Sequence, residues 1–229
     1  MQVVIGRIYS VCFSERLESR ATVRAAELAR GGALGRVVQT VGLGPHRTNL
    51  ATRPEWFFRR AAYGGILVDI GAHQADQFLY ITGSTSAEVV TAQVANYQHP
   101  QFPELEDFGE MLLRGPQATG YVRVDWYTPA GLPTWGDGRL FILGTEGYCE
   151  VRKYVDVGGR PGGDHLLWVD RAGPHIEDCR DGPLPYGAQL IADIRQRTET
   201  AMSQAHCFLA CELALRAQAM AARLGHLAG

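Results

Sequence analysis

The stretch that decides the fold is GGILVDIGAHQAD, residues 64–76. Its apolar spacing predicts a helix that begins after the two glycines, and on that helix Asp69 and His73 lie one turn apart on the same face. Asp76 follows three residues after His73. An imidazole beside a carboxylate forms a proton-transfer pair, because the carboxylate orients the ring and stabilises its charged form. The two glycines let a ligand or another backbone approach closely.

The segments on both sides of this run predict an α+β fold. Periodicity of about 3.6 residues predicts helices, and period-two or β-branched character predicts strands. The predicted helices are residues 19–30, 54–60, 67–82, 187–199 and 203–224. The predicted strands are residues 3–12, 35–43, 87–98, 107–114, 118–127, 139–144, 147–155 and 165–170. Tight Gly and Pro turns favour hairpins, so we expect one large, mostly antiparallel β-sheet with helices on one face.

The other face of that sheet would carry large side chains, such as those of residues 121–127. Large exposed apolar patches usually mark partner surfaces. We therefore expect the open sheet face to be used for oligomerisation. A half-solvated sheet without a partner is the alternative.

Length and composition exclude several classes of protein. The chain has 229 residues, of which 46% are hydrophobic, so it has the composition of a globular protein with one large domain or slightly more. The net charge is −2 and no charge runs occur, so we expect no nucleic-acid partner and no acidic membrane surface. No apolar run approaches the ~20 residues that span a bilayer.

The cysteines indicate a reducing compartment. There are five, none in a C-x-x-C motif, and Cys207 and Cys211 fall on one face of a predicted helix, where small apolar residues are common. An odd number of cysteines without a signal-peptide pattern favours a cytoplasmic location.

The run at 64–76 resembles the GG-x-L-x-D-x-G-x-H-x-x-D signature in the second domain of the Gfo/Idh/MocA family of NAD(P)-dependent oxidoreductases. Further segments resemble the turn into the first strand of that domain, its short Trp-bearing segment, a G-T-x-G strand turn and its closing helix. They are residues 31–38, 53–56, 144–147 and 203–224. From about residue 10 onward, nearly the whole chain resembles the C-terminal half of the family.

The sequence also departs from the family pattern. Family members begin with a Rossmann domain that carries a Gly-rich dinucleotide loop and a Lys-Pro pair with the catalytic lysine. Neither occurs here, and the only lysine, Lys153, falls on a predicted strand. The resemblance implies that residues 1–12 are a remnant of the last Rossmann strand and that residues 13–229 form the C-terminal α/β domain.

The resemblance also assigns site residues. It implies that His73 is the general base at a substrate carbinol and that Asp69 orients it. The substrate-binding candidates are Trp56, Arg53, His46 and Asp76. Gly64 and Gly65 are candidates for contact with the cofactor, NAD or NADP, which would be bound mainly by a domain missing from this chain. A structural role is the alternative for each: a core histidine, a core tryptophan or a solvated loop residue.

Three functions are compatible with these residues. The first is the substrate-binding domain of an NAD(P)-dependent oxidoreductase that acts on a sugar, polyol or related hydroxy compound, forming a homodimer or homotetramer through the sheet. The second is a non-catalytic small-molecule-binding or oligomerisation module derived from that family. The third is a metal-dependent lyase or hydrolase that uses Asp69, His73 and Asp76 with His46 or His165; nothing in the spacing demands a metal, so we expect none. Hydride transfer needs the nicotinamide within reacting distance of the substrate, so enzyme activity of this chain alone is left open.

Overall fold

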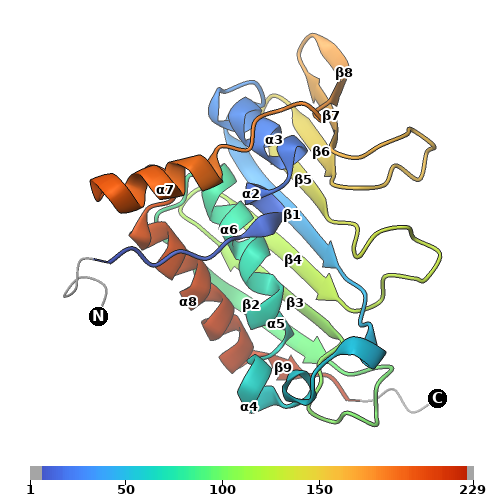
Figure 1. The fold of residues 1–229 in the computed structure, drawn as a ribbon. Coiled ribbons are helices and arrows are strands. Elements are labelled where there is room, and N and C mark those ends of the chain that lie inside the picture. The colour runs from blue at the N-terminus through green and yellow to red at the C-terminus, as the bar shows by residue number, and fades with distance from the viewer. Residues whose placement is uncertain (1–6, 226–229) are drawn as a thin grey trace.

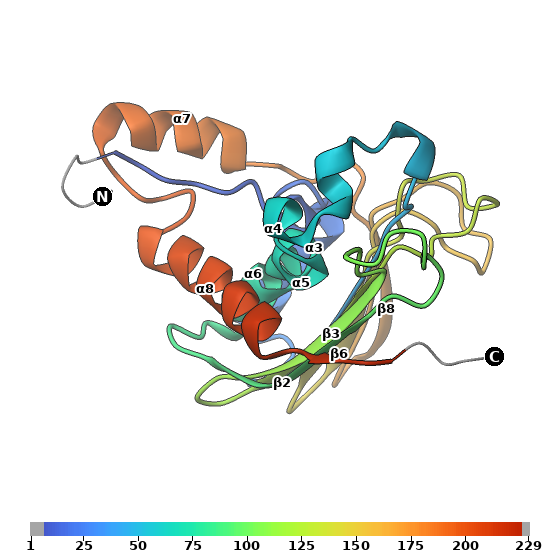
Figure 2. The ribbon, with the colours of Figure 1, turned by 90° about the horizontal axis from the view of Figure 1, so that it is seen from below.

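The computed structural model describes residues 7–225 and has two layers, a nine-stranded sheet and a layer of helices on one of its faces (Figures 1 and 2). The strands are β1 (Val37–Pro45), β2 (Glu88–Ala95), β3 (Phe108–Arg114), β4 (Thr119–Asp125), β5 (Arg139–Gly144), β6 (Tyr148–Arg152), β7 (His165–Asp170), β8 (Gly173–Asp178) and β9 (Ala222–Arg223). Their order across the sheet is β8-β7-β6-β5-β1-β4-β3-β2-β9. Only β1 with β4 and β2 with β9 pair in parallel, which confirms the mostly antiparallel sheet.

The helices cover one side of this sheet (Figure 2). They are α2 (Ser14–Leu17), α3 (Arg20–Arg30), α4 (Arg60–Tyr63), α5 (Ile66–Asp69), α6 (Gly71–Thr82), α7 (Tyr186–Gln196) and α8 (Gln204–Met220), with the short 3-10 turns η1 (Leu50–Thr52) and η2 (Glu55–Phe58). None of the helices in residues 7–225 is long and apolar enough to cross a bilayer. The α+β class predicted from the sequence is therefore confirmed.

Local chemistry sets the ends of these helices. The Ser19 side chain accepts a hydrogen bond from the Thr22 N–H, which caps α3, and α3 ends at Arg30, the last residue of the predicted helix. Ser203 caps α8 in the same way through the N–H of His206. Gly83 ends α6 at φ +67°, a conformation that glycine adopts without steric cost.

Several predicted elements differ in the structure. The single helix expected at 67–82 is two helices, α5 and α6, that meet at Ile70, where the His73 N–H donates to the Ile70 carbonyl three residues back. The expected strand at 3–12 is not seen in its described part, because residues 7–13 pair with no strand; residues 3–6 lie outside the described range. The short elements α2, β8 and β9 were not predicted, since two to six residues carry little periodic signal.

Two apolar clusters join the layers. One lies between α5, α6 and α8 and the strands β2, β3 and β4, and includes Phe78, Met111 and Leu213. The other lies between α3 and the strands β5, β6 and β7, and includes Ala25 and Ile142. Burial against the sheet, rather than helix propensity, therefore holds the short helices in place.

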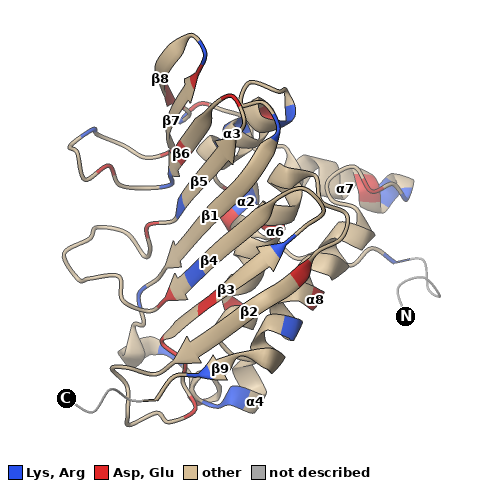
Figure 3. Cartoon of the chain, turned by 180° about the vertical axis from the view of Figure 1, so that it is seen from behind, with Lys and Arg blue, Asp and Glu red and all other residues tan. Residues whose placement is uncertain are grey.

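None of the described elements covers the opposite face of the sheet (Figure 3). Along β5, Leu140 and Ile142 are buried under the helices while Phe141 and Leu143 alternate to the other side and are exposed. Tyr148, which pairs with Leu143, is also exposed. The open face thus presents the large apolar side chains of Phe141, Leu143 and Tyr148, while Glu150 and Arg152 lie on the same face further along β6.

Candidate functional site

Asp69 is a free carboxylate at the junction of two helices. It ends α5 and is exposed, and within residues 7–225 it accepts no hydrogen bond. Surrounding protein nevertheless raises its pKa, while the nearby charges of Arg53, His73 and His46 lower it, in that order of effect. The guanidinium of Arg53 and the imidazoles of His73 and His46 therefore lie within electrostatic reach of a carboxylate that remains open to water, as a ligand-binding group must be.

His73 lies just inside α6, half-buried. Its Nδ1 is buried without a hydrogen-bond partner among the described residues, and its ring meets the edge of Phe13 with 5.8 Å between centroids. Burial is the main cause that lowers the pKa of His73, and Glu15 and Asp76 oppose it. A neutral imidazole at pH 7 is the form that can accept a proton. No hydrogen bond joins it to Asp69, because the break at Ile70 places the two residues on different helices.

His46 joins this group from the end of β1. Its Nδ1 lies 3.1 Å from the Gly44 carbonyl, which can only accept, so Nδ1 carries the proton and Nε2 is the free nitrogen. Nε2 lies 3.9 Å from Glu15 Oε1. The Lys153 ammonium donates to the same Glu15 oxygen over 2.9 Å. Glu15 and Lys153 therefore belong to the site, although the sequence did not single them out as site residues.

Arg53 is fixed in an aromatic cage. Its guanidinium carbon lies 4.1 Å from the Phe57 ring centroid, 4.7 Å from that of Trp126 and 5.1 Å from that of Trp135. Its Nε donates to the Thr48 carbonyl at 2.9 Å, while Nη2 is buried without a partner. Burial lowers the pKa of Arg53, and the charge of Asp69 opposes this. Two candidate residues, Arg53 and Asp69, are thus brought together by contacts that leave one guanidinium nitrogen free.

Trp56 is placed differently from Arg53. It is 51% exposed and packs its edge against Phe57. An exposed indole on a 3-10 turn is available for contact with a ligand or a second domain. Trp56 is therefore not a core residue, which was the structural alternative expected from the sequence.

Asp76 is separated from the exposed groups. It is fully buried and accepts two hydrogen bonds from Arg16, over 2.7 and 2.6 Å, and one from His206 Nε2 over 2.7 Å. These partners hold the pKa of Asp76 below its usual value although burial alone would raise it. In this structure Asp76 anchors α2 and α8 to α6 through its hydrogen bonds with Arg16 and His206.

The backbone conformation and the close packing around residues 64 and 65 explain why both are glycines. Gly64 has φ +88° and ends α4, and Gly65 has φ +103°. A Cβ on Gly65 would lie 2.1 Å from Oε1 of Gln218, which accepts the N–H of Leu67. The missing side chain of Gly65 thus makes room for α8. Contact of these glycines with a cofactor stays a prediction.

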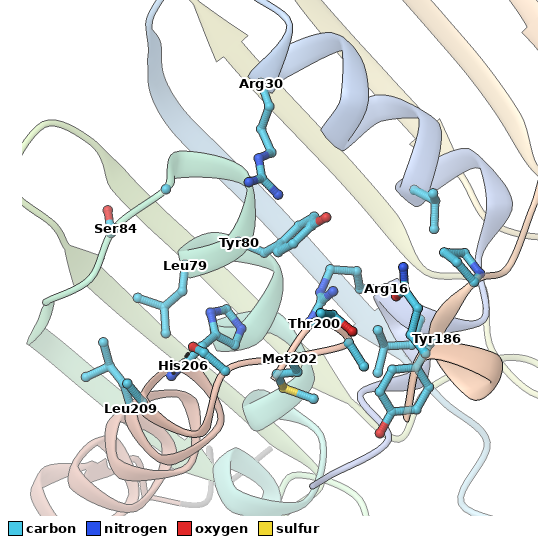
Figure 4. A pocket seen from close by; sticks show the side chains of 18 of the residues that line it. Arg16, Arg30, Leu79, Tyr80, Ser84, Tyr186, Thr200, Met202, His206 and Leu209 are labelled. Carbon is cyan, nitrogen blue, oxygen red and sulfur yellow. Dashed lines mark hydrogen bonds between the residues drawn. The ribbon is translucent and has the colours of Figure 1, made fainter. Parts of the chain in front are cut away.

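A pocket of about 480 Å³ lies on the helical side, between α3, α6, α7 and α8 (Figure 4). Arg16 and Arg30 place their guanidinium carbons 4.1 and 4.9 Å from the Tyr80 ring centroid, and His206 also lines the pocket. Asp69 and His73 do not line it. The predicted proton-transfer pair therefore lies outside this pocket.

Metal ligation has no support in the donor set. No group of three or more His, Cys, Asp or Glu that could hold a metal ion occurs within residues 7–225. Asp76 is already saturated by Arg16 and His206. The arrangement at Asp69 and His73 fits proton transfer and hydrogen bonding to a small polar ligand.

Comparison with known proteins agrees with this fold. A family model described as the GFO/IDH/MocA C-terminal domain matches residues 22–150. The structure of a protein proposed to be an oxidoreductase, from Erwinia carotovora atroseptica, is 48% identical, with a TM-score of 0.94 over 98% of this chain and 67% of that chain. The chain therefore belongs to the GFO/IDH/MocA oxidoreductase family and corresponds to its C-terminal domain. No match is found among functionally curated proteins.

More distant solved structures share the fold. An oxidoreductase from Agrobacterium radiobacter, in complex with NAD+, L-tartaric acid and magnesium, is 17% identical with a TM-score of 0.68, over 90% of this chain and 61% of that chain. An aldose-aldose oxidoreductase from Caulobacter crescentus, complexed with glycerol, is 20% identical with a TM-score of 0.61, over 90% of this chain and 57% of that chain. This chain thus spans about three fifths of the length of these two proteins.

Proposed function

We propose that this chain is the substrate-binding domain of an NAD(P)-dependent dehydrogenase that acts on a sugar, polyol or related hydroxy compound. The observation that carries the proposal is the pairing of a free, exposed Asp69 carboxylate with a half-buried His73 whose pKa is lowered by burial. Family membership, and relatives whose structures hold NAD+, a hydroxy acid or glycerol, support the same class of substrate.

Oxidation of a carbinol removes a proton from oxygen and a hydride from carbon. Neutral His73 is placed to accept the hydroxyl proton, and Asp69 and Arg53 to hold neighbouring hydroxyl or carboxylate groups. NAD or NADP, when bound, supplies the hydride acceptor. Gln218 fills the space beside Gly65 on the side of α8, and contact of the glycine pair with the cofactor remains a prediction. We infer that the cofactor is held mainly by a nucleotide-binding domain outside these 229 residues.

Ligand binding tests this proposal. The chain is titrated with glycerol, D-glucose and L-tartrate by isothermal calorimetry, with and without NAD+. At least one should bind, and Asp69→Asn and His73→Gln should each weaken binding about tenfold, because each removes about one hydrogen bond to the ligand. His165→Gln is the control, since that ring meets the Gly162 carbonyl away from the site. Equal affinities in all variants would contradict the assignment. NAD+ should have little effect on the affinity of this chain by itself, because the cofactor is expected mainly on a second domain.

We further propose that the chain forms a homodimer or homotetramer through its open sheet face. Exposed Phe141, Leu143 and Tyr148 support this, because adjacent large apolar side chains on β5 and β6 are unfavourable in water. Light scattering of the wild-type chain should give a mass of two or four chains, and Leu143→Glu should reduce it. Leu215→Glu, which changes an exposed leucine of α8 on the helical side of the sheet, is the control. A monomeric wild type would refute the proposal.

A further inference from the structure

Arg53 is a half-buried cation without a carboxylate partner. In the described part of the chain its guanidinium forms no ion pair, and its one hydrogen bond runs from Nε to the Thr48 carbonyl. Arg16 and Arg60, which are also partly or fully buried, each lie 2.6 Å from a carboxylate oxygen. Arg47, half-buried like Arg53, donates instead to three backbone carbonyls of the connection between β4 and β5. The charge of Arg53 is therefore not neutralised by direct contact with a protein anion.

Aromatic rings hold this guanidinium in place. Its central carbon lies 4.1, 4.7 and 5.1 Å from the ring centroids of Phe57, Trp126 and Trp135. Trp135 is itself fixed, because its carbonyl accepts the backbone N–H of Arg47 over 2.8 Å. Rings favour a cation, but they supply no hydrogen bonds in place of the water that they displace. Arg53 is thus held ready for an acceptor, which lowers the entropy cost of binding one.

One nitrogen of the guanidinium is open to a ligand. Nη2 is buried without a partner, whereas Nη1, which also lacks a partner among the described residues, is not buried. A carboxylate at Nη1 would make a charge-assisted hydrogen bond, about twice as strong as a bond between neutral groups. A neutral hydroxyl at the same place would leave the positive charge uncompensated. Arg53 therefore favours an anionic group over a neutral one.

The other free groups around Arg53 accept hydrogen bonds. His46 packs against Trp126, one of the rings that hold Arg53, with 6.0 Å between ring centroids, and its Nε2 is the nitrogen left free by the Gly44 carbonyl. Asp69 is exposed and accepts no hydrogen bond from the described residues. Acceptors of this kind bind hydroxyl groups and repel carboxylates. A ligand that satisfies both kinds of group carries hydroxyls along its chain and a carboxylate at one end.

We propose that Arg53 determines the substrate class of this domain, and that the substrate is a hydroxy acid of the aldonic or uronic type whose carboxylate binds Nη1 of Arg53. Under the proposed function, on which this proposal rests, His73 takes the proton of a hydroxyl on that acid. The ring cage keeps the guanidinium at a fixed place, so the carboxylate sets which hydroxyl of the chain reaches the free acceptors. A neutral sugar or polyol lacks this anchor.

Matched acids and neutral compounds test the proposal. The full chain is titrated by calorimetry with D-glycerate and glycerol, D-gluconate and D-sorbitol, and D-glucuronate and D-glucose. In each pair the acid carries a carboxylate where the neutral compound carries one CH₂OH group. At least one acid should bind, with an affinity about tenfold or more above that of its neutral partner, as expected for a hydrogen bond between charged groups.

Variants of Arg53 connect this preference to its guanidinium. Arg53→Gln should reduce the affinity for the acid to about that for the neutral partner and change the affinity for the neutral partner little. Arg53→Lys keeps the charge and should retain part of the preference, although it loses the planar donor group. Arg216→Gln is the control, since it removes an exposed arginine of α8 that pairs with Glu212, and it should keep the full preference.

The outcomes separate this proposal from the proposed function. A neutral compound that binds as tightly as its acid partner would overturn the role of Arg53 and leave the proposed function intact. A preference for the acid that survives in Arg53→Gln, or that is lost equally in Arg216→Gln, would overturn it as well. Absence of binding for all six compounds would refute both proposals.

Discussion

Replacement of Asp76 by Asn tests whether this residue anchors the helical layer. The carboxylate is fully buried and accepts hydrogen bonds from Nε and Nη2 of Arg16 and from Nε2 of His206. An amide keeps the shape but turns an N–H₂ group toward these donors and leaves the Arg16 charge uncompensated, with its side chain 5% exposed. The folded state should therefore be strongly destabilised.

The expected loss is about 3–5 kcal/mol, as for other buried ion pairs that lose one partner. This is a large fraction of the about 5–15 kcal/mol that stabilises a typical domain. With a urea m-value of about 2–3 kcal/mol/M, the unfolding midpoint should fall by about 1–2.5 M. Fluorescence of the four tryptophans follows the transition.

Glu88→Gln is the matched control. Glu88 and Arg114 form an ion pair of 2.6 Å whose side chains are 58% and 59% exposed, so its loss should cost no more than about 1 kcal/mol. A midpoint for Asp76→Asn as high as that of Glu88→Gln would refute the anchoring role.

The dependence of stability on pH in the acid range gives a second test of the role of Asp76. Its pKa is depressed in the folded state, so its stabilising effect is complete above the unfolded pKa of about 3.9 and is lost as the pH falls through the folded value. The difference in stability between wild type and Asp76→Asn should therefore be constant near neutrality and shrink below about pH 4. A difference that is constant down to pH 2 would contradict the ion pair.

Three further predictions follow from burial and backbone geometry. Gly65→Ala should lower stability by about 2 kcal/mol or more because its Cβ would meet Gln218, whereas Gly32→Ala, at φ +82° with nothing within 4 Å, should cost only about 1 kcal/mol; equal urea midpoints would contradict the clash. Cys12 is the exposed cysteine, so a thiol reagent should modify it before the other cysteines. Cys12→Ser should abolish the fast phase of thiol modification, and an unchanged fast phase would refute this. The pKa of His73 is lowered in the folded state, so the unfolded chain takes up this proton at higher pH, and the free energy of unfolding should fall as the pH drops below about 6.5. His73→Gln should flatten the dependence of stability on pH in this range. The same pH dependence in wild type and variant would contradict the lowered pKa.

The position of the candidate site bears on how the protein works. Asp69 is exposed and His73 is half-buried, and neither residue lines the 480 Å³ pocket among Arg16, Tyr80 and His206. A substrate held at an exposed carboxylate outside a pocket keeps much of its contact with water. This geometry agrees with the proposal that a second domain completes the substrate site.

The sequence by itself determined the class of the fold, the family and the order of most elements. Local signals sufficed for these: period-two strands between Gly and Pro turns, the 3.6-residue periodicity of the helices, and the run at residues 64–76. They act through neighbouring residues, so they can be recognised without knowing what lies across the fold.

Only the tertiary structure decided the surroundings of each side chain. The break at Ile70, the burial of Asp76 between Arg16 and His206, and the meeting of Glu15 with Lys153 join segments up to 138 residues apart. No local pattern encodes such contacts, because they form only when sheet and helices pack. The same polar residue is a ligand-binding group where packing leaves it open, as at Asp69, and a structural anchor where packing surrounds it, as at Asp76.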